Sequence, residues 1–300
     1  MKKIALWAMC IAVMVLSGCR KPPEWKAEHV FVIGLDGWGA YSVEKADMPN
    51  VKALMDAGCY TLKKRSVLPS SSAVNWASMF MGAGPELHGY TEWGSRTPEL
   101  PSRVLNEHGI FPTVFSELRK AAPDAEMGVL YEWDGIKYLV DTLALNHHAQ
   151  APDYNTHPTA LCDMACEYIT QKKPVLSAFC FDNPDHVGHG DGHDTPAYYA
   201  KLRELDGYVG RIVDAIKEAG IYENSIIIVT ADHGGINKGH GEKTMEEMET
   251  PFIIAGKNIK KGGAFEESMM QFDCASTIAS VFNLEQPQVW IGRPMTQVFE

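Results

Sequence analysis

The 300-residue sequence contains only seven cysteines, and no two of them form a CxxC pair. Cys10 lies in the first hydrophobic run, and the five cysteines beyond Cys19 are an odd number, so they cannot form a complete set of disulfides. Cys162 and Cys166 are four residues apart on an expected helix, a spacing that suits packing better than a bridge. We therefore expect neither a thiolate zinc site nor chemistry based on sulfur.

Positive charge is also scarce, with 27 Lys and Arg against 38 Asp and Glu and a formal net charge of −11. This balance argues against a nucleic-acid polymer as a partner bound through its backbone. It leaves a small anionic substrate open, because bound metal ions can reverse the field at one site. The sequence has no internal repeat or low-complexity tract, and its 45% hydrophobic and 22% charged residues are typical of a globular protein.

The sequence has no hydrophobic run long enough to span a bilayer, because the run at 4–16 is too short. It follows the basic residues MKK and ends in LSGC, a pattern that resembles a bacterial lipobox. We expect residues 1–18 to be a lipoprotein signal peptide, Cys19 to carry lipid after cleavage, and residues 19–28 to be a tether. The protein would then be exported and anchored to a bacterial membrane, on the periplasmic or cell-surface side. An ordinary secretory signal with a chance cysteine is the alternative.

From residue 29 onward, short β-branched runs alternate with helical patterns. Strands are expected at 29–36, 126–133, 174–182, 224–235 and 250–256, and helices at 48–58, 72–84, 111–123, 195–220 and 273–283. Nearly continuous apolar strands separated by helices indicate an α/β fold in which a mostly parallel central sheet is covered by helices on both faces. We expect 29–300 to form a single domain.

Three expected strands end in acidic residues, namely Asp36, Asp182 with Asp185, and Asp232. In open α/β sheets, ligands bind at the carboxyl ends of strands, so we expect these side chains to converge. The segment FCFDNPDHVGHGDGHD at 179–194 contains four Asp and three His. Because Gly and Pro interrupt it, we expect a loop rather than a helix, with a metal ion neutralising its charges.

Four separate segments supply candidate site residues. They are Asp36 in GLDG, Ser70, Ser71, Ser72 and Asn75 in PSSSAVN, Asp185 and His189 in PDHVGH, and Asp232, His233 and His240 in the TADHGG and GHG segments. Each has an ordinary reading as a turn former, a helix cap or a polar loop. Their joint occurrence favours a metal site. Mixed carboxylate and imidazole ligands suit Zn²⁺, and also Mn²⁺ or Fe²⁺.

The order of these motifs resembles the alkaline phosphatase superfamily. The chain looks most similar to the type I phosphodiesterase/nucleotide pyrophosphatase family, through GLDG, PSSSAVNWASMFMGAGPELHG, PDHVGHGDG and TADHGG, over roughly residues 30–294. The resemblance implies an alkaline-phosphatase-like catalytic domain over 29–300, with its metal site at the C-terminal ends of the strands.

The resemblance further implies two divalent metal ions, zinc before manganese or iron. Asp185, His189 and a later histidine would hold the first; we choose His240 for that histidine and keep His193 as the alternative. Asp36, Asp232 and His233 would hold the second, with Ser72 completing its ligands. Ser72 is also the implied nucleophile, giving a phosphoserine intermediate. Asn75 would donate a hydrogen bond to a phosphoryl oxygen.

The expected activity is therefore a lipid-anchored, metal-dependent hydrolase of phosphate esters, of the phosphodiester or nucleotide type. A phosphomonoesterase or phosphonate hydrolase is the main alternative. A sulfatase is disfavoured because the SSSAVNW segment has neither the Pro nor the Arg of a C/S-x-P-x-R motif. A non-catalytic binding lipoprotein is a fourth reading. The sequence leaves open the natural substrate, the native metal, the membrane that holds the anchor and the oligomeric state.

Overall fold

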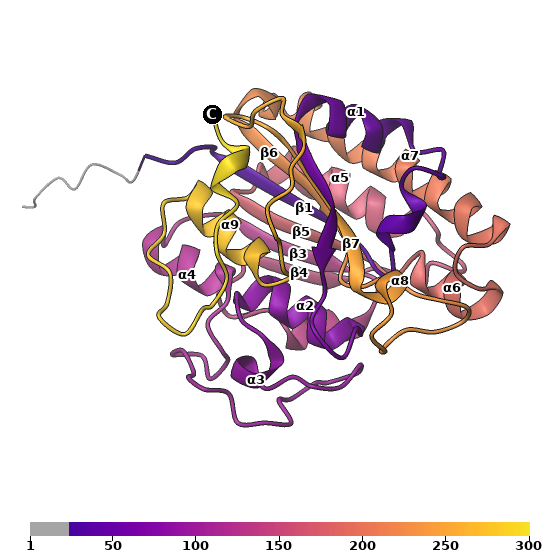
Figure 1. The fold of residues 1–300 in the computed structure, drawn as a ribbon. Coiled ribbons are helices and arrows are strands. Elements are labelled where there is room, and N and C mark those ends of the chain that lie inside the picture. The colour runs from indigo at the N-terminus through magenta and orange to yellow at the C-terminus, as the bar shows by residue number, and fades with distance from the viewer. Residues whose placement is uncertain (1–23) are drawn as a thin grey trace, which may run out of the picture.

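The computed structural model describes residues 24–300, and its centre is an eight-stranded sheet in the order β4-β3-β5-β1-β6-β7-β2-β8 (Figure 1). The expected signal peptide and Cys19 lie outside the described residues. The strands are β1 (His29–Leu35), β2 (Cys59–Arg65), β3 (Met127–Tyr131), β4 (His147–Gln150), β5 (Leu176–Phe181), β6 (Ser225–Thr230), β7 (Glu249–Gly256) and β8 (Gly263–Ala264).

Parallel pairing dominates the sheet. β1 lies between β5 and β6 and is parallel to both, and β3 is parallel to β5 and β4. Only β7 runs against its neighbours, β6 and β2. This confirms the predicted mostly parallel α/β sheet.

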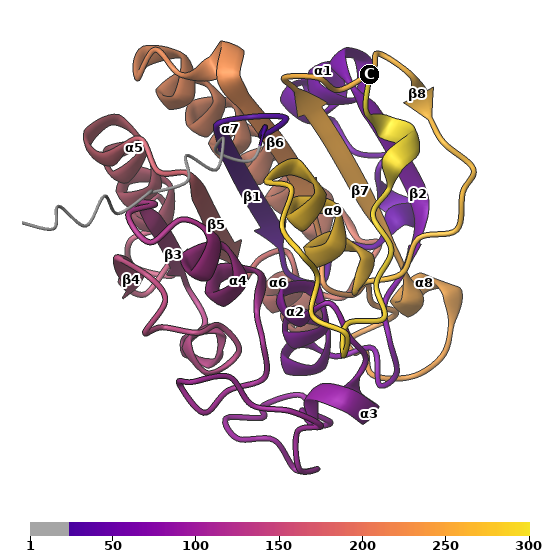
Figure 2. The same ribbon diagram turned by 90° about the vertical axis from the view of Figure 1, so that its left-hand side faces the viewer.

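Helices cover both faces of the sheet. The α-helices of residues 24–300 are α1 (Pro49–Ala57), α2 (Ser72–Met81), α3 (Pro85–His88), α4 (Val114–Ala121), α5 (Ala160–Lys172), α6 (Asp185–Asp191), α7 (Pro196–Glu218), α8 (Met245–Met248) and α9 (Asp273–Val281). Helices α1, α5 and α7 pack on one face, and α2, α4 and α9 pack on the other (Figures 1 and 2).

The central strand β1 shows why helices pack on both faces of the sheet. All seven of its residues are buried. Val30 and Val32 belong to the apolar core beneath α2, α4 and α9, whereas Phe31, Ile33 and Leu35 belong to the core beneath α1, α5 and α7. A strand that is apolar on both faces is typical of the interior of a parallel sheet.

The structure differs from the sequence-based prediction in several elements, among them the short α3, α8 and β8, which were not predicted. The segment expected to be a loop is helical from Asp185 to Asp191, directly after Pro184, and the helix ends at Gly192, whose φ of 102° only glycine adopts readily. Strand β2 was not predicted, because it carries three Lys and Arg at a sheet margin. Strand β4 was not predicted, because its sequence is HHAQ. No helix among residues 24–300 is long and apolar enough to cross a membrane.

Candidate metal centre

The predicted site residues meet at the carboxyl ends of β1, β5 and β6, at the end of the sheet where α2 and α6 lie (Figure 2). Asp36 follows β1, Asp185 begins α6 after β5, and Asp232 follows β6. Ser72 begins α2, and His240 reaches the same place from the loop before α8. The chain therefore brings together side chains separated by up to about two hundred residues, as expected for strand ends in an open sheet.

Asp185, His189 and His240 form a first group, in which one ligand atom from each lies within 4.8 Å of the others. Asp185 and His189 are one helical turn apart on α6, which places His189 Nε2 3.1 Å from Asp185 Oδ2. His240 Nε2 lies 3.1 Å from His189 Nε2 and 3.7 Å from Asp185 Oδ2. The arrangement is one that a single cation could occupy.

A second group surrounds His233. Its Nε2 lies 3.3 Å from Asp36 Oδ1, 3.3 Å from Asp232 Oδ2 and 3.1 Å from Ser72 Oγ. Asp185 also lies within 4.8 Å of Asp36 and His233, so it stands between the two groups. The two groups contain every metal ligand predicted from the sequence, although their binding of metal stays a prediction.

The three histidines are oriented for coordination by their other ring nitrogens. His233 Nδ1 is 2.8 Å from the carbonyl of Gly234, His189 Nδ1 is 3.0 Å from that of Lys238, and His240 Nδ1 is 3.1 Å from that of Ser70. A carbonyl can only accept, so each Nδ1 carries a proton, and Nε2 is the ring nitrogen that remains to bind a cation once the ring is neutral. Backbone carbonyls commonly fix metal-binding imidazoles in this way.

These residues fit bound cations, because several of their oxygens have no other partner. Asp36 Oδ1, Asp185 Oδ1 and Asp232 Oδ2 are buried and accept no hydrogen bond from residues 24–300. Burial and the neighbouring carboxylates raise the pKa of Asp36 well above its usual value, and burial with Asp185 raises that of Asp232 to about 7. Buried carboxylates that face imidazole lone pairs repel them unless a positive charge lies between them.

His193, the alternative first-group ligand, occupies a different position. It is buried, and its Nε2 is 3.7 Å from Asp185 Oδ1. Neither of its ring nitrogens has a hydrogen-bond partner among residues 24–300, and burial lowers its pKa to about 4. His193 approaches Asp185 from beside α6, whereas His240 meets both Asp185 and His189. This geometry favours His240 as the third ligand.

Asn75 has a different place from the one expected. Its side chain is fully buried: Oδ1 accepts a 2.7 Å hydrogen bond from the Val67 amide, and Nδ2 donates to the carbonyls of Val67, Pro69 and Ser71. The amide is thus already used within the turn that leads to Ser72. The expected bond to a phosphoryl oxygen is therefore corrected to a positioning role: Asn75 holds this turn.

Sequence reasoning missed the residues that position the ligands. Trp76 Nε1 donates a 3.0 Å hydrogen bond to Asp36 Oδ2, and Gly34 makes room for that indole, since a Cβ there would lie 2.3 Å from the ring. The fully buried Lys64 donates to the carbonyl of Ala231, next to Asp232, and to the side chain of Gln271. A Trp one turn after Ser72 was visible in the sequence. The role of Lys64 was not, because its strand was not predicted.

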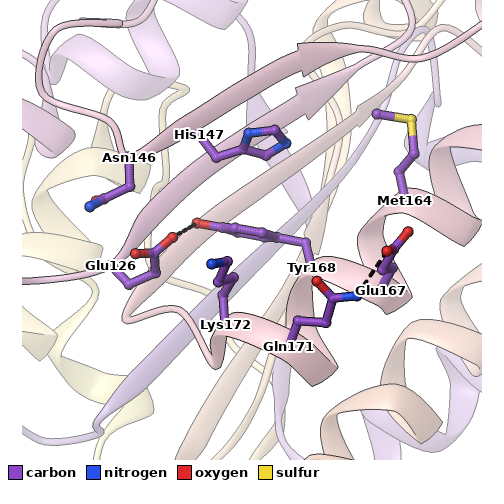
Figure 3. Close-up of a pocket in the computed structure, with 8 residues that line it drawn as sticks. All are labelled: Glu126, Asn146, His147, Met164, Glu167, Tyr168, Gln171 and Lys172. Carbon is purple, nitrogen blue, oxygen red and sulfur yellow. Dashed lines mark hydrogen bonds between the residues drawn. The ribbon is translucent and has the colours of Figure 1, made fainter.

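Two clefts differ in what they offer. A cleft of about 690 Å³ adjoins the first group and includes His189, His240, Glu92 and Trp93 in its lining. Another, of about 620 Å³, lies beside α5 and the start of β3 (Figure 3). In that second cleft Tyr168 donates to Glu126 over 2.9 Å and Gln171 donates to Glu167 over 2.8 Å, so these polar groups satisfy one another. The first cleft is therefore the candidate for substrate.

Comparisons with known proteins agree with this geometry. The family model for type I phosphodiesterase / nucleotide pyrophosphatase matches residues 30–276. Ectonucleotide pyrophosphatase/phosphodiesterase family member 3 of Mus musculus is 22% identical over 233 residues, which are 71% of this chain and 25% of the relative. The chain thus spans about a quarter of that relative's length.

Two solved structures share the fold. Murine ectonucleotide pyrophosphatase / phosphodiesterase 5, in an inactive form with AMP, superposes with a TM-score of 0.75 at 15% identity, over 91% of this chain and 100% of that one. A phosphonate monoester hydrolase from Silicibacter pomeroyi gives 0.69 at 16% identity, over 89% and 76% of the two chains. At these identities the likeness shows the fold alone.

Proposed function

Because the chain belongs to the type I phosphodiesterase / nucleotide pyrophosphatase family, we propose that it is a metal-dependent hydrolase of phosphate esters that acts on phosphodiesters. The observation that carries the proposal is the meeting of Ser72 Oγ with Asp36, Asp232 and His233 at the start of a helix. A hydroxyl beside bound cations has a lowered pKa and can therefore attack a phosphoryl group as a nucleophile. The nucleotide found with a structural neighbour supports nucleotide-type diesters as members of the substrate class.

We propose that Asp185, His189 and His240 hold one divalent cation, and that Asp36, Asp232, His233 and Ser72 hold a second, with zinc preferred over manganese or iron. When bound, the pair lowers the pKa of the oxygens it coordinates and neutralises charge on the phosphoryl group.

Ser72 would act as the nucleophile. Its hydroxyl loses its proton to solvent and its oxygen attacks phosphorus, so that a bond from Oγ to phosphorus forms while the bond to the leaving oxygen breaks. The leaving oxygen takes up a proton from solvent and departs as an alcohol. The phosphoserine formed from a diester still carries the second alcohol. Water then attacks phosphorus, the bond to Oγ breaks and Ser72 recovers a proton. The positive end of α2, which begins at Ser72, favours the phosphoryl charge throughout.

A panel of p-nitrophenyl esters tests the reaction class. We expect the metal-loaded protein to hydrolyse bis-p-nitrophenyl phosphate faster than p-nitrophenyl phosphate, and p-nitrophenyl sulfate hardly at all. Removal of the cations with a chelator should lower the diester rate at least about 100-fold, and added Zn²⁺ or Mn²⁺ should restore it. Dominant sulfate turnover would contradict the proposal, dominant monoester turnover would move it to a phosphomonoesterase, and no turnover of any ester would favour a binding lipoprotein.

We also propose that the protein is a membrane lipoprotein anchored through Cys19, on the strength of the LSGC motif after a short hydrophobic run. The full chain expressed in a bacterium should partition with membranes and incorporate labelled palmitate. Replacing Cys19 by Ser should abolish labelling, whereas replacing Cys162 by Ser should not. Equal labelling of the wild type and the Cys19 variant would rule out this anchor.

A further inference from the structure

The cleft beside the metal centre is lined by residues that could select the organic group of a substrate. It is lined by Pro69, Ser71, Glu92, Trp93, His189 and His240, together with two glycines. Because His189 and His240 belong to the first group of candidate ligands, a phosphate held there would project an organic substituent into this cleft. The wall residues therefore bear on which phosphate esters the site accepts.

Trp93 is an exposed aromatic residue on a loop whose backbone is tied to the start of α2. Its side chain is 68% exposed. The backbone around it is nevertheless fixed, since its carbonyl accepts a 3.0 Å hydrogen bond from Ala73, the residue after Ser72, and the Glu92 amide donates to Ser95 Oγ over 3.1 Å. Burial of such a large apolar surface by a ligand is favourable. The loop thus keeps the backbone of Trp93 beside the start of α2, where the nucleophile lies.

Among the residues that the structure describes, the lining of the cleft carries a negative charge and no Lys or Arg. Apart from the two imidazoles, Glu92 is the only ionisable side chain in its lining, and no Lys or Arg of residues 24–300 is among the lining residues. Arg96, the nearest cation along the loop, turns to Asp134 at 3.8 Å and to the ring of Tyr138 at 5.4 Å. Lys238, next to the lining residue Gly239, donates to the carbonyl of Gly190 over 2.6 Å. A second phosphate or a carboxylate on the substrate would therefore face Glu92 with no Lys or Arg in the described lining to compensate it.

We propose that this cleft takes the positively charged organic group of the substrate, so that the preferred phosphate esters are those of an amino or quaternary ammonium alcohol. An ammonium group is attracted both to a carboxylate and to the face of an indole, and Glu92 and Trp93, neighbours in the chain, both line the cleft. The inference rests on the proposed function only in placing the phosphate at the metal centre. A neutral nucleobase could stack on Trp93 and donate a hydrogen bond to Glu92, but it would bring no positive charge to that carboxylate.

Competitive binding separates the contribution of charge from that of shape. Phosphocholine and 3,3-dimethylbutyl phosphate have the same shape and differ in one positive charge. We expect phosphocholine to inhibit hydrolysis of bis-p-nitrophenyl phosphate by the metal-loaded protein about tenfold more strongly than its neutral analogue. If that diester is not hydrolysed, calorimetric binding of the two ligands replaces inhibition, so that failure of the activity and failure of the cleft assignment remain distinct.

Two variants locate the effect. Glu92→Gln should bring the ratio of the two inhibition constants to within about twofold, and Trp93→Leu should weaken phosphocholine about fivefold. Glu267→Gln removes one negative charge from an exposed position elsewhere and should leave the tenfold ratio unchanged. Equal binding of the two ligands by the wild type, or a preference that survives Glu92→Gln, would overturn the proposal. Tighter binding of AMP than of phosphocholine, insensitive to Glu92→Gln, would overturn it in favour of a nucleobase.

Discussion

Replacing Ser72 by Ala should lower kcat on bis-p-nitrophenyl phosphate by at least about 10³-fold while leaving the protein folded and its metal content close to that of the wild type. The side chain is only 8% exposed, and its hydroxyl has a single partner, His233 Nε2 at 3.1 Å. Three other side chains surround the same position, so loss of one oxygen leaves most of the cation ligands in place. The measurements are steady-state kinetics and elemental analysis of the purified variant.

The neighbouring serine supplies a matched control. Ser71 precedes α2 and lines the cleft, yet its hydroxyl has no hydrogen-bond partner among residues 24–300. Ser71→Ala should therefore lose far less of kcat than Ser72→Ala. Acid quenching of the wild type during turnover should trap a phosphoryl ester on the peptide that contains Ser72. If Ser72→Ala keeps wild-type activity, or if the ester forms on Ser70 or Ser71, the nucleophile has been assigned to the wrong residue.

The sequence predicted that the candidate ligands would lie close together because they follow buried strands; that they bind metal stays a prediction. Asp36 and Asp232 come directly after apolar runs, and parallel strands bring their carboxyl ends to one edge of the sheet. The spacing of Asp185 and His189 proved equally informative, although for another reason than expected. The sequence predicts a loop for this segment. In the structure Asp185 and His189 lie one turn apart on α6, and this spacing brings their ligand atoms together.

The parts that the sequence could not predict depend on contacts between distant segments. Asn75 looked like a substrate ligand, but its side chain is occupied by the backbone of Val67, Pro69 and Ser71. Nothing local distinguishes an amide that turns outward from one that closes a turn. Lys64 looked like a surface residue of a charged segment, yet β2 places its ammonium group behind Asp232, fully buried. Only the tertiary arrangement creates these roles.

Replacing Asp232 by Asn should have opposite effects on stability and on activity. In the metal-free protein the carboxylate is fully buried, and its Oδ2 faces His233 Nε2 at 3.3 Å with no hydrogen-bond donor among residues 24–300. An Asn keeps the oxygen that accepts from the Gly37 amide and puts an NH₂ group toward the imidazole lone pair. We expect the free energy of unfolding of the metal-free protein to rise by about 1–3 kcal/mol.

The same substitution removes an anionic ligand, so metal affinity should fall by at least about 100-fold and kcat by at least about 10³-fold. Asp206 provides the contrast, because this buried carboxylate already accepts hydrogen bonds from the amides of Asn50 and Val51. Asp206→Asn turns an NH₂ group toward those donors and should destabilise the protein with or without metal. Thermal unfolding in chelator and in Zn²⁺ compares the two variants. If Asp232→Asn destabilises the metal-free protein as Asp206→Asn does, the Asp232 carboxylate must have a favourable partner within the protein. Its assignment as a metal ligand would then be wrong.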